Sequence, residues 1–375
     1  MRTDTLVVNA AAAWLPPRRQ VPAEIGATAE DTGYTALAVS DGPSAPEMAV
    51  LAADAALEQA GWPAAELDLL LHAWSYYQGH DFWSPAHYIA DQLGAHAAQP
   101  IGIQQMCNGG AAGLQIAAAH LLGDPSIARV LVTTADRFCP PGFDRWNSDL
   151  GVAYGDGASA VLVSRDTAGG AGGAGGAGAG EAGLDAPAAG PVVGAGADER
   201  TAGANERAGA LRLVAVSSVS APNLEGMHRG DDDFSPAARA TAAAVDVRRT
   251  KRAYLRRHGS SGYRAAERER VETLLRLAVD EAGLTRDGRR PRYVVLPRVH
   301  RGPLESVLVP LVGEVTGAEP LDFGRSTGHL GAGDLTTGIS DLLDNKILAP
   351  GETALVLSTG AGFTWSCAAL TAPAG

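Results

Sequence analysis

The sequence predicts an α/β fold built from two related halves. Strand-like and helix-like patterns alternate through residues 1–166 and again through residues 210–375. Residues 167–209 are rich in glycine and alanine and cannot bury enough apolar surface to offset chain entropy, which indicates a flexible surface insertion. Two helical patterns, ending in QAG and EAG, each precede a short apolar strand by a similar gap, which suggests an internal repeat.

In the first half, an apolar run at the N-terminus predicts a core strand that stops at a Pro-Pro turn. Residues 45–61 repeat apolar side chains at spacings of three and four and stop at a glycine, which is typical of an amphipathic helix. The apolar runs at 67–74, 128–136 and 158–165 have the length and composition of buried strands.

The second half repeats this alternation. Residues 211–220 predict a strand, and residues 263–283 predict a long amphipathic helix that ends in glycine. A short apolar strand follows at 292–299, and a helix follows at 305–315. Residues 354–370 have the pattern of a closing pair of strands.

Charge and cysteine content restrict the class of protein. The formal net charge of −12 argues against a nucleic-acid binder, which usually has a basic footprint. The three cysteines Cys107, Cys139 and Cys367 are too few for a disulfide framework, so we expect a reducing, cytoplasmic location. The apolar N-terminal stretch is too short to span a bilayer, and we expect no membrane insertion.

Residues 100–122 (PIGIQQMCNGGAAGLQIAAAHLL) form the most informative segment. A strand-like start leads into Cys107, followed by two glycines and a helix of small and apolar residues, which is typical of a buried helix. The positive end of a helix dipole favours a thiolate, and the glycines allow a tight turn close to a substrate. The pattern therefore indicates a nucleophile for covalent acyl catalysis. An inert buried cysteine is the alternative.

Four stretches in order resemble the type III ketosynthases: the Cys107 segment, Tyr154–Ala158 (YGDGA), Gly328–Asp334 (GHLGAGD) and Gly360–Trp365 (GAGFTW). The resemblance implies the thiolase fold, five layers in the order αβαβα, and a homodimer. It also implies an oxyanion hole formed by the backbone N–H groups of Cys107 and Ala361, which would stabilise a tetrahedral intermediate.

The sequence departs from this family at two positions. Decarboxylative members pair the cysteine with a histidine and an asparagine, but this chain has Arg298 and His329 at those places. Cysteine with histidine and a carboxylate suits acyl transfer to a hydroxyl or amine, as in the ketosynthase III-like acyltransferases of antibiotic pathways. We expect His300 as the base and Asp334 as its partner, with His329 as the competing base. His300 as a surface residue, Asp334 as a helix N-cap and His329 as part of a polar turn are the alternatives.

Two further segments suggest binding surfaces. The aromatic stretch 72–88 predicts either an acceptor pocket or a dimer interface, and its histidines lack the spacing of a metal site. The basic stretch 245–259 predicts a docking site for an acidic acyl carrier protein or for a phosphate of coenzyme A (CoA), or else a solvated helix face. Residues 24–42 lack the Trp and Arg of the family's CoA-binding signature, which favours a carrier-protein donor.

Taken together, the sequence predicts an acyltransferase of natural-product biosynthesis. Its donor would be a phosphopantetheine or CoA thioester and its acceptor a small molecule. No tightly bound cofactor and no metal are expected. A decarboxylative ketosynthase that forms a carbon–carbon bond is the alternative. A non-catalytic partner subunit is a third reading, which the presence of Cys107 argues against.

Overall fold

The computed structural model describes residues 1–21, 32–166, 210–237 and 243–374. The Gly/Ala-rich insertion predicted at residues 167–209 lies outside these ranges, so the domain boundaries drawn around it stay a prediction. Within the described ranges, no helix is both long and apolar enough to cross a lipid bilayer.

The first half starts with its longest strand and ends with a strand antiparallel to it. Its strands in the main sheet are β1 (Arg2–Trp14), β4 (Leu69–Ala73), β5 (Gln99–Ile103), β6 (Arg129–Asp136) and β7 (Gly157–Arg165). Its helices are α2 (Ala45–Ala60), α3 (Pro85–Leu93) and α4 (Gly109–Gly123). A small separate sheet pairs β2 (Arg18–Gln20) with β3 (Ala36–Ala38).

The second half contains five further strands and a larger set of helices. Its strands are β8 (Leu211–Ser220), β9 (Tyr293–Val295), β10 (Glu319–Leu321), β11 (Thr353–Gly360) and β12 (Thr364–Thr371). Its helices are α5 (Gly226–Arg229), α6 (Val247–His258), α7 (Ser260–Glu281), α8 (Arg301–Pro303), α9 (Val309–Thr316) and α10 (Asp334–Asp344).

Both halves follow the same topology. Among the described residues, ten strands are hydrogen-bonded in the order β10-β9-β11-β12-β8-β1-β7-β6-β4-β5. The order β1-β7-β6-β4-β5 of the first half therefore matches β8-β12-β11-β9-β10 of the second. The helices α2, α3 and α4 match α7, α9 and α10 in their positions between the strands. The two sets of strands meet where β1 pairs with β8 in antiparallel orientation.

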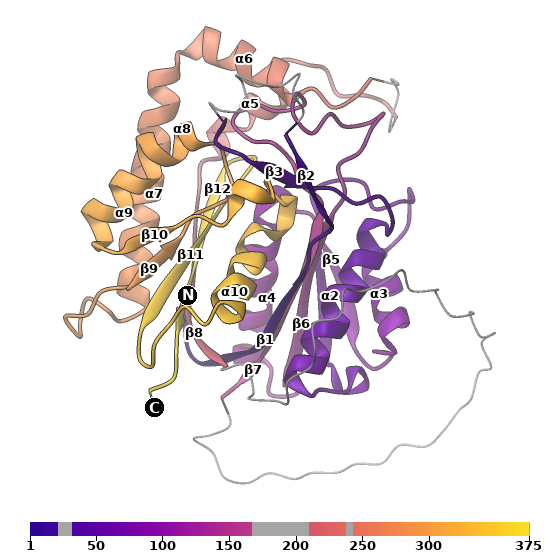
Figure 1. The fold of residues 1–375 in the computed structure, drawn as a ribbon, viewed down its shortest axis with the longest axis vertical. Coiled ribbons are helices and arrows are strands. Elements are labelled where there is room, and N and C mark those ends of the chain that lie inside the picture. The colour runs from indigo at the N-terminus through magenta and orange to yellow at the C-terminus, as the bar shows by residue number, and fades with distance from the viewer. Residues whose placement is uncertain (22–31, 167–209, 238–242, 375) are drawn as a thin grey trace.

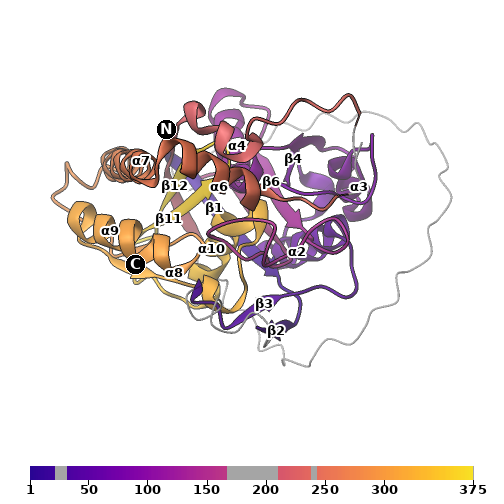
Figure 2. The same cartoon turned by 90° about the horizontal axis from the view of Figure 1, so that it is seen from above.

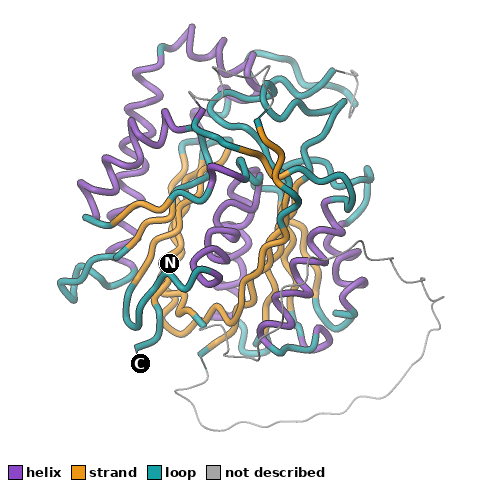
Figure 3. Tube along the Cα trace, in the orientation of Figure 1, coloured by secondary structure: helices purple, strands orange, loops and turns teal. Residues whose placement is uncertain are grey.

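The elements stack in five layers (Figure 1). Helices α4 and α10 lie between the two five-stranded sets, with α2 and α3 outside the first and α7 and α9 outside the second. The view from above shows the outer helices on opposite sides of the molecule (Figure 2). In Figure 3 the two central helices stand between two groups of strands. The αβαβα order and the two related halves are thus confirmed.

Burial follows the layers because strand side chains alternate between the two faces of a sheet. Leu114 of α4 and Leu335 of α10 share a buried cluster with Leu71 of β4. The neighbouring Leu70 points to the opposite face and packs in the cluster under α2 and α3. Leu275 of α7 belongs to a third cluster, which lies outside the second set of strands. Three apolar clusters therefore fill the spaces between the five layers.

Helix α2 shows how local sequence sets an element. Ser44 and Glu47 form a capping box in which the Glu47 carboxylate accepts from the Ser44 N–H at 2.7 Å. Gly61 ends the helix in the left-handed conformation, with φ of 65°. The helix predicted at 45–61 is confirmed within one residue at its end. The predicted long helix of the second half starts three residues earlier than expected, at Ser260.

Candidate active site

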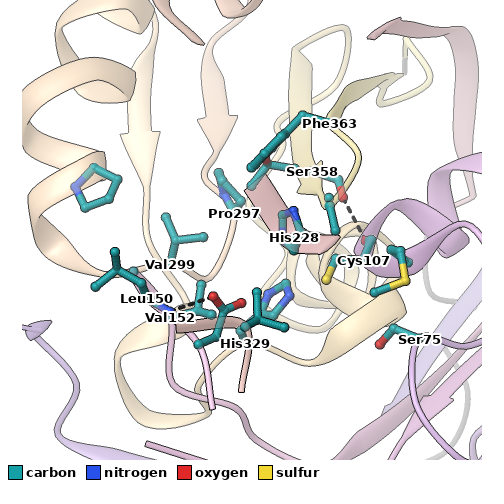
Figure 4. Close-up of a pocket in the computed structure, with 18 of the residues that line it drawn as sticks. Ser75, Cys107, Leu150, Val152, His228, Pro297, Val299, His329, Ser358 and Phe363 are labelled. Carbon is teal, nitrogen blue, oxygen red and sulfur yellow. Dashed lines mark hydrogen bonds between the residues drawn. The ribbon is translucent and has the colours of Figure 1, made fainter. Parts of the chain in front are cut away.

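A cavity of about 270 Å³ lies where the two halves meet (Figure 4). Cys107 from the first half and His329 from the second both line it. Most of its remaining wall is apolar and aromatic, including Phe138, Phe143, Val299, Leu308, Phe363 and Trp365. Concave apolar pockets with a few convergent polar groups are typical of small-molecule sites.

Cys107 lies in a short 3-10 turn, Met106–Asn108, directly before α4. Met106 has φ of 48°, a left-handed conformation that costs a non-glycine residue roughly 1–2 kcal/mol. The Ser358 hydroxyl of β11 donates to the Cys107 carbonyl at 3.2 Å, as Figure 4 shows. Strand β11 of the second half thus fixes the turn that carries the thiol.

Two glycines bring the Cys107 turn against the second half. A Cβ at Gly109 would lie 2.9 Å from the Cβ of Ala332, and a Cβ at Gly110 would lie 2.8 Å from the Ala332 carbonyl oxygen. A Cβ carbon essentially never approaches another heavy atom this closely, so only glycine lets the two segments touch. The glycines predicted to permit close approach of a substrate therefore serve close approach of the chain itself.

His329 and Asp334 form a buried pair beside Cys107. The distance from His329 Nδ1 to Asp334 Oδ2 is 2.7 Å, and both side chains are almost fully shielded from solvent. The Asp334 carboxylate also accepts the backbone N–H groups of Leu330 and Arg298, each at 2.9 Å. These three donors hold the carboxylate in one orientation, so Nδ1 of His329 is its fixed partner.

The charges of this pair depend on one another. Burial alone would lower the pKa of His329, but the Asp334 carboxylate, the Cys107 sulfur and hydrogen bonds to both raise it well above its usual value. Burial would raise the pKa of Asp334, yet the His329 charge and hydrogen bond, with Arg298, lower it. The imidazolium form of His329 is therefore stabilised between the Asp334 carboxylate and the Cys107 sulfur in its thiolate form.

The YGDGA stretch holds His329 in place. The backbone N–H of Gly155 donates to the His329 carbonyl and the N–H of His329 donates to the Ala153 carbonyl, each at 2.9 Å. The rings of Tyr154 and His329 meet edge to face with centroids 5.2 Å apart. Any side chain at Gly155 would collide with the Thr327 carbonyl. This segment of the first half is thus part of the support of the histidine.

Arg298, at the position of the family's histidine, is turned away from the cavity. Its Nη1 donates to the Phe323 carbonyl at 2.8 Å and to the Thr327 hydroxyl at 2.7 Å, and its Nη2 pairs with Asp341. Its backbone N–H holds Asp334. The guanidinium therefore does not line the cavity, and Arg298 contributes to the site through its backbone bond to Asp334.

The structure does not bring His300 to the cavity wall. His300 precedes α8, its backbone N–H donates to the Gly151 carbonyl at 3.0 Å, and its ring packs edge to face on Tyr34 at 5.5 Å. Burial, with the charge of Arg248, lowers its pKa to about 4. Of the two histidines proposed as bases, the geometry favours His329.

Ala361, the proposed second oxyanion donor, lines the cavity together with Cys107. It follows Gly360 at the end of β11, where a Cβ would lie 2.8 Å from the backbone nitrogen of Asn108. The amide of Asn108 in turn donates to the Thr364 carbonyl. The turn around Ala361 is therefore packed directly on the turn of the nucleophile.

Asp136, at the end of β6, is a supporting residue that the sequence analysis missed. Its carboxylate accepts the backbone N–H groups of Ser75 at 3.0 Å, Tyr76 at 2.7 Å and Ala332 at 2.9 Å. Burial raises its pKa to about 6. It ties the first half to the loop between His329 and Asp334. A polar residue that ends an apolar strand was the available signal.

The aromatic stretch 72–88, predicted as an acceptor pocket or a dimer interface, divides between the cavity and the outside. Tyr76 of the aromatic stretch lines the cavity, whereas Phe82 and Trp83 are exposed. His72 of the same stretch is buried in β4 and bonded to Thr133 and Gln78. Among the described residues, no cluster of His, Cys, Asp or Glu could hold a metal ion.

Two family models match parts of the chain on either side of the cavity. The family 3-oxoacyl-(acyl-carrier-protein) synthase III matches residues 101–177, and its C-terminal domain matches residues 312–372. These two matches, with the structural likeness given below, support a ketosynthase III-like protein of the thiolase superfamily. The β-ketoacyl-(acyl-carrier-protein) synthase III of Synechococcus sp. strain RCC307 is 33% identical over 137 residues. That match covers 35% of this ketosynthase III-like chain and 39% of the relative's length.

Solved structures resemble the ketosynthase III-like chain over nearly its whole length. The acyltransferase ChlB3 is 28% identical with a TM-score of 0.78, covering 99% of this chain and 98% of that one. The 3-oxoacyl-(acyl-carrier-protein) synthase III of Aquifex aeolicus VF5 is 17% identical with a TM-score of 0.67, covering 98% and 99%. The second likeness concerns the fold alone.

Proposed function

We propose that this protein is an acyltransferase that carries the acyl group on Cys107 and passes it to a hydroxyl or amine. The observation that carries the proposal is the buried His329–Asp334 pair beside Cys107, with 2.7 Å between the bonded atoms. In the decarboxylative enzymes that the sequence resembles, an asparagine occupies the place of His329 and stabilises an enolate. A histidine held by a carboxylate is suited instead to moving a proton.

Acylation needs a nucleophilic sulfur and a proton for the departing thiol. His329 takes the proton of the Cys107 thiol, and the raised pKa of the imidazole favours this ion pair. The sulfur attacks the thioester carbonyl, so that one carbon–sulfur bond forms while the bond to the donor thiol breaks. The departing thiolate takes the proton from His329. The N–H groups of Cys107 and Ala361 are the proposed donors to the carbonyl oxygen.

The transfer step uses His329 again, now as the base for the acceptor. Once Cys107 is acylated its sulfur carries no charge, so its contribution to the raised pKa of His329 is lost. The neutral imidazole accepts the proton of the acceptor O–H or N–H, and the acceptor attacks the acyl carbonyl. The bond to Cys107 then breaks, and His329 returns the proton to the sulfur. Asp334 holds Nδ1–H and stabilises the imidazolium.

The donor side of the proposal rests on α6, which borders the cavity. Its Lys251 lines the cavity and pairs with Asp149 at 2.5 Å. Arg252 and Arg256, on the same helix, have no carboxylate partner among the described residues. An acidic acyl carrier protein could bind these arginines and place its pantetheine thioester near the cavity. A CoA thioester is the alternative donor.

Three further parts of the proposal rest on the resemblance and the composition. A homodimer is supported by the exposed aromatic side chains Phe82 and Trp83, which suit a subunit interface. A cytoplasmic location agrees with the three free cysteines. A role in natural-product biosynthesis rests on the resemblance of the sequence to the ketosynthase III-like acyltransferases of antibiotic pathways, in which a histidine and a carboxylate accompany the cysteine.

Intact-protein mass after incubation with acetyl-pantetheine tests the mechanism. We expect an acetyl adduct on the wild type and none on the Cys107→Ala variant. Malonyl-pantetheine, tested in parallel, distinguishes acyl transfer from decarboxylative condensation. Carbon dioxide release with a β-keto product would favour the decarboxylative ketosynthase. Absence of any adduct on Cys107 with either thioester would contradict both and favour a non-catalytic subunit.

A further inference from the structure

The cavity that contains Cys107 holds a second histidine that the mechanism above does not use. His228 lies in α5, and its side chain lines the cavity together with Cys107 and His329 (Figure 4). Its Nδ1 is buried and has no hydrogen-bond partner among the described residues. A buried polar atom without a partner is rare in proteins and needs an explanation, such as a missing ligand.

The structure holds this imidazole firmly. The Thr250 hydroxyl of α6 donates to the His228 carbonyl at 2.8 Å, and the ring packs against Phe363 with centroids 5.0 Å apart. Burial, with the nearby charge of Lys251, lowers the pKa of His228 to about 4, so the ring is neutral at pH 7. A neutral imidazole both donates and accepts one hydrogen bond, which matches a hydroxyl group.

The charges around the cavity disfavour a carboxylate. Three basic side chains occur among its lining residues within the described part of the chain: His228, Lys251 and His329. Lys251 is already paired with Asp149 at 2.5 Å, and His329 with Asp334 at 2.7 Å. An added carboxylate would therefore be buried without a free cation, which is costly.

The size of the cavity limits the bound group. Its volume of about 270 Å³ is close to the lower end of the range of small-molecule pockets, roughly 300–1,000 Å³. We therefore expect a short acyl chain to fill it. Apolar and aromatic side chains surround the remaining volume, so the rest of the group should be apolar.

We propose that His228 binds a hydroxyl group of the acyl chain, so that the protein selects compact hydroxylated acyl groups over plain alkyl groups and over acyl groups that carry a carboxylate. This inference rests on the proposed acyl-enzyme at Cys107 and names the class of acyl group that it holds. His228 acts here in recognition, while the proton transfers remain with His329.

Loading of matched six-carbon thioesters tests the inference. Pantetheine thioesters of hexanoate, of its 3-, 4-, 5- and 6-hydroxy derivatives and of hexanedioate are compared by the rate of adduct formation on Cys107. At least one hydroxylated thioester should have a kcat/KM for loading roughly tenfold or more above that of hexanoyl. Hexanedioyl should load more slowly than hexanoyl. Faster hexanedioyl loading, or no hydroxyl preference, would overturn the inference.

Variants at position 228 test whether His228 causes the preference for hydroxylated thioesters. His228→Phe keeps a ring against Phe363 but removes the nitrogens, and it should abolish the preference for the hydroxyl. His228→Asn should restore part of it. Because the ratio of two thioesters is measured on one sample, partial misfolding lowers both rates and leaves the ratio intact. A preference unchanged in His228→Phe would refute the role of His228 even though acyl loading persists. Absence of loading by any thioester would refute the acyl-enzyme itself.

Discussion

The turn before α4 and the turn before α10 occupy equivalent places in the two halves, yet they contribute different groups to one site. Cys107 lies in the 3-10 turn Met106–Asn108, and the 3-10 turn Gly331–Gly333 separates His329 from Asp334. The first turn supplies a nucleophile and the second a buried carboxylate–histidine pair. Equivalent backbone positions thus carry complementary chemistry, and the proposed reaction needs both.

The two turns also differ in how they are supported. The Cys107 turn is fixed mainly by contact with the second half, through Ser358 and the close approach of Gly110 to Ala332. The histidine turn is fixed by hydrogen bonds from the first half, through Gly155 and Asp136. Each half therefore positions the reactive group of the other. A substitution that distorts one turn should therefore also displace the reactive group on the other.

Of the substitutions considered, loss of the His329 imidazole should have the largest effect on the rate of acyl transfer. His329→Ala should lower the rate of acyl transfer by roughly 10³- to 10⁴-fold, because it removes the proposed base that takes the acceptor's proton. Single-turnover transfer from the preformed acyl-enzyme measures this. His300→Ala is the matched control and should stay near the wild-type rate. An equal loss in His300→Ala would return the role of base to His300.

Replacing the carboxylate should give a smaller loss and a shift with pH. Asp334→Asn should slow transfer by roughly 10²- to 10³-fold, because the amide no longer fixes the imidazole. Transfer needs neutral His329, so its rate rises as pH rises through the pKa of His329. Because Asp334 raises that pKa, its loss should move the midpoint of the pH–rate profile to lower pH. A midpoint that stays in place would show that Asp334 is not coupled to the base.

Adding one methyl group between the Cys107 turn and the turn Gly331–Gly333 should have the smallest effect, and we expect it in the stability of the protein. Gly110→Ala places a Cβ 2.8 Å from the Ala332 carbonyl oxygen, which should lower the free energy of unfolding by about 1–3 kcal/mol. Gly123→Ala, at the open end of the same helix, meets no atom within 4 Å and should be neutral or stabilising by up to about 1 kcal/mol. Denaturant unfolding measures both. Equal stabilities would mean that the turns are not in tight contact.

The layers could be predicted from sequence because they depend on local patterns. The apolar spacing of α2 and its terminal Gly61 define a helix, and the apolar run at Leu69–Ala73 defines a buried strand. Cys107 could be found because the turn and the helix that present it are contiguous in sequence.

The rest of the site depends on contacts between distant segments. Choosing between His300 and His329 requires knowing that Arg298 turns away from the cavity and that Tyr154 packs on the ring of His329. His228 was missed because it stands in the four-residue helix α5, which has no periodic pattern. Only the folded chain brings it to the same cavity as Cys107.

The repeated turn also bears on how such proteins diversify. Since the chain contains two copies of one loop-and-helix unit, the copy that holds Cys107 can stay unchanged while the other exchanges its side chains. In this chain, the second copy presents His329 and Asp334 on a backbone that matches the first. A duplicated architecture thus lets selection alter the reaction at one copy while the nucleophile is inherited intact from the other.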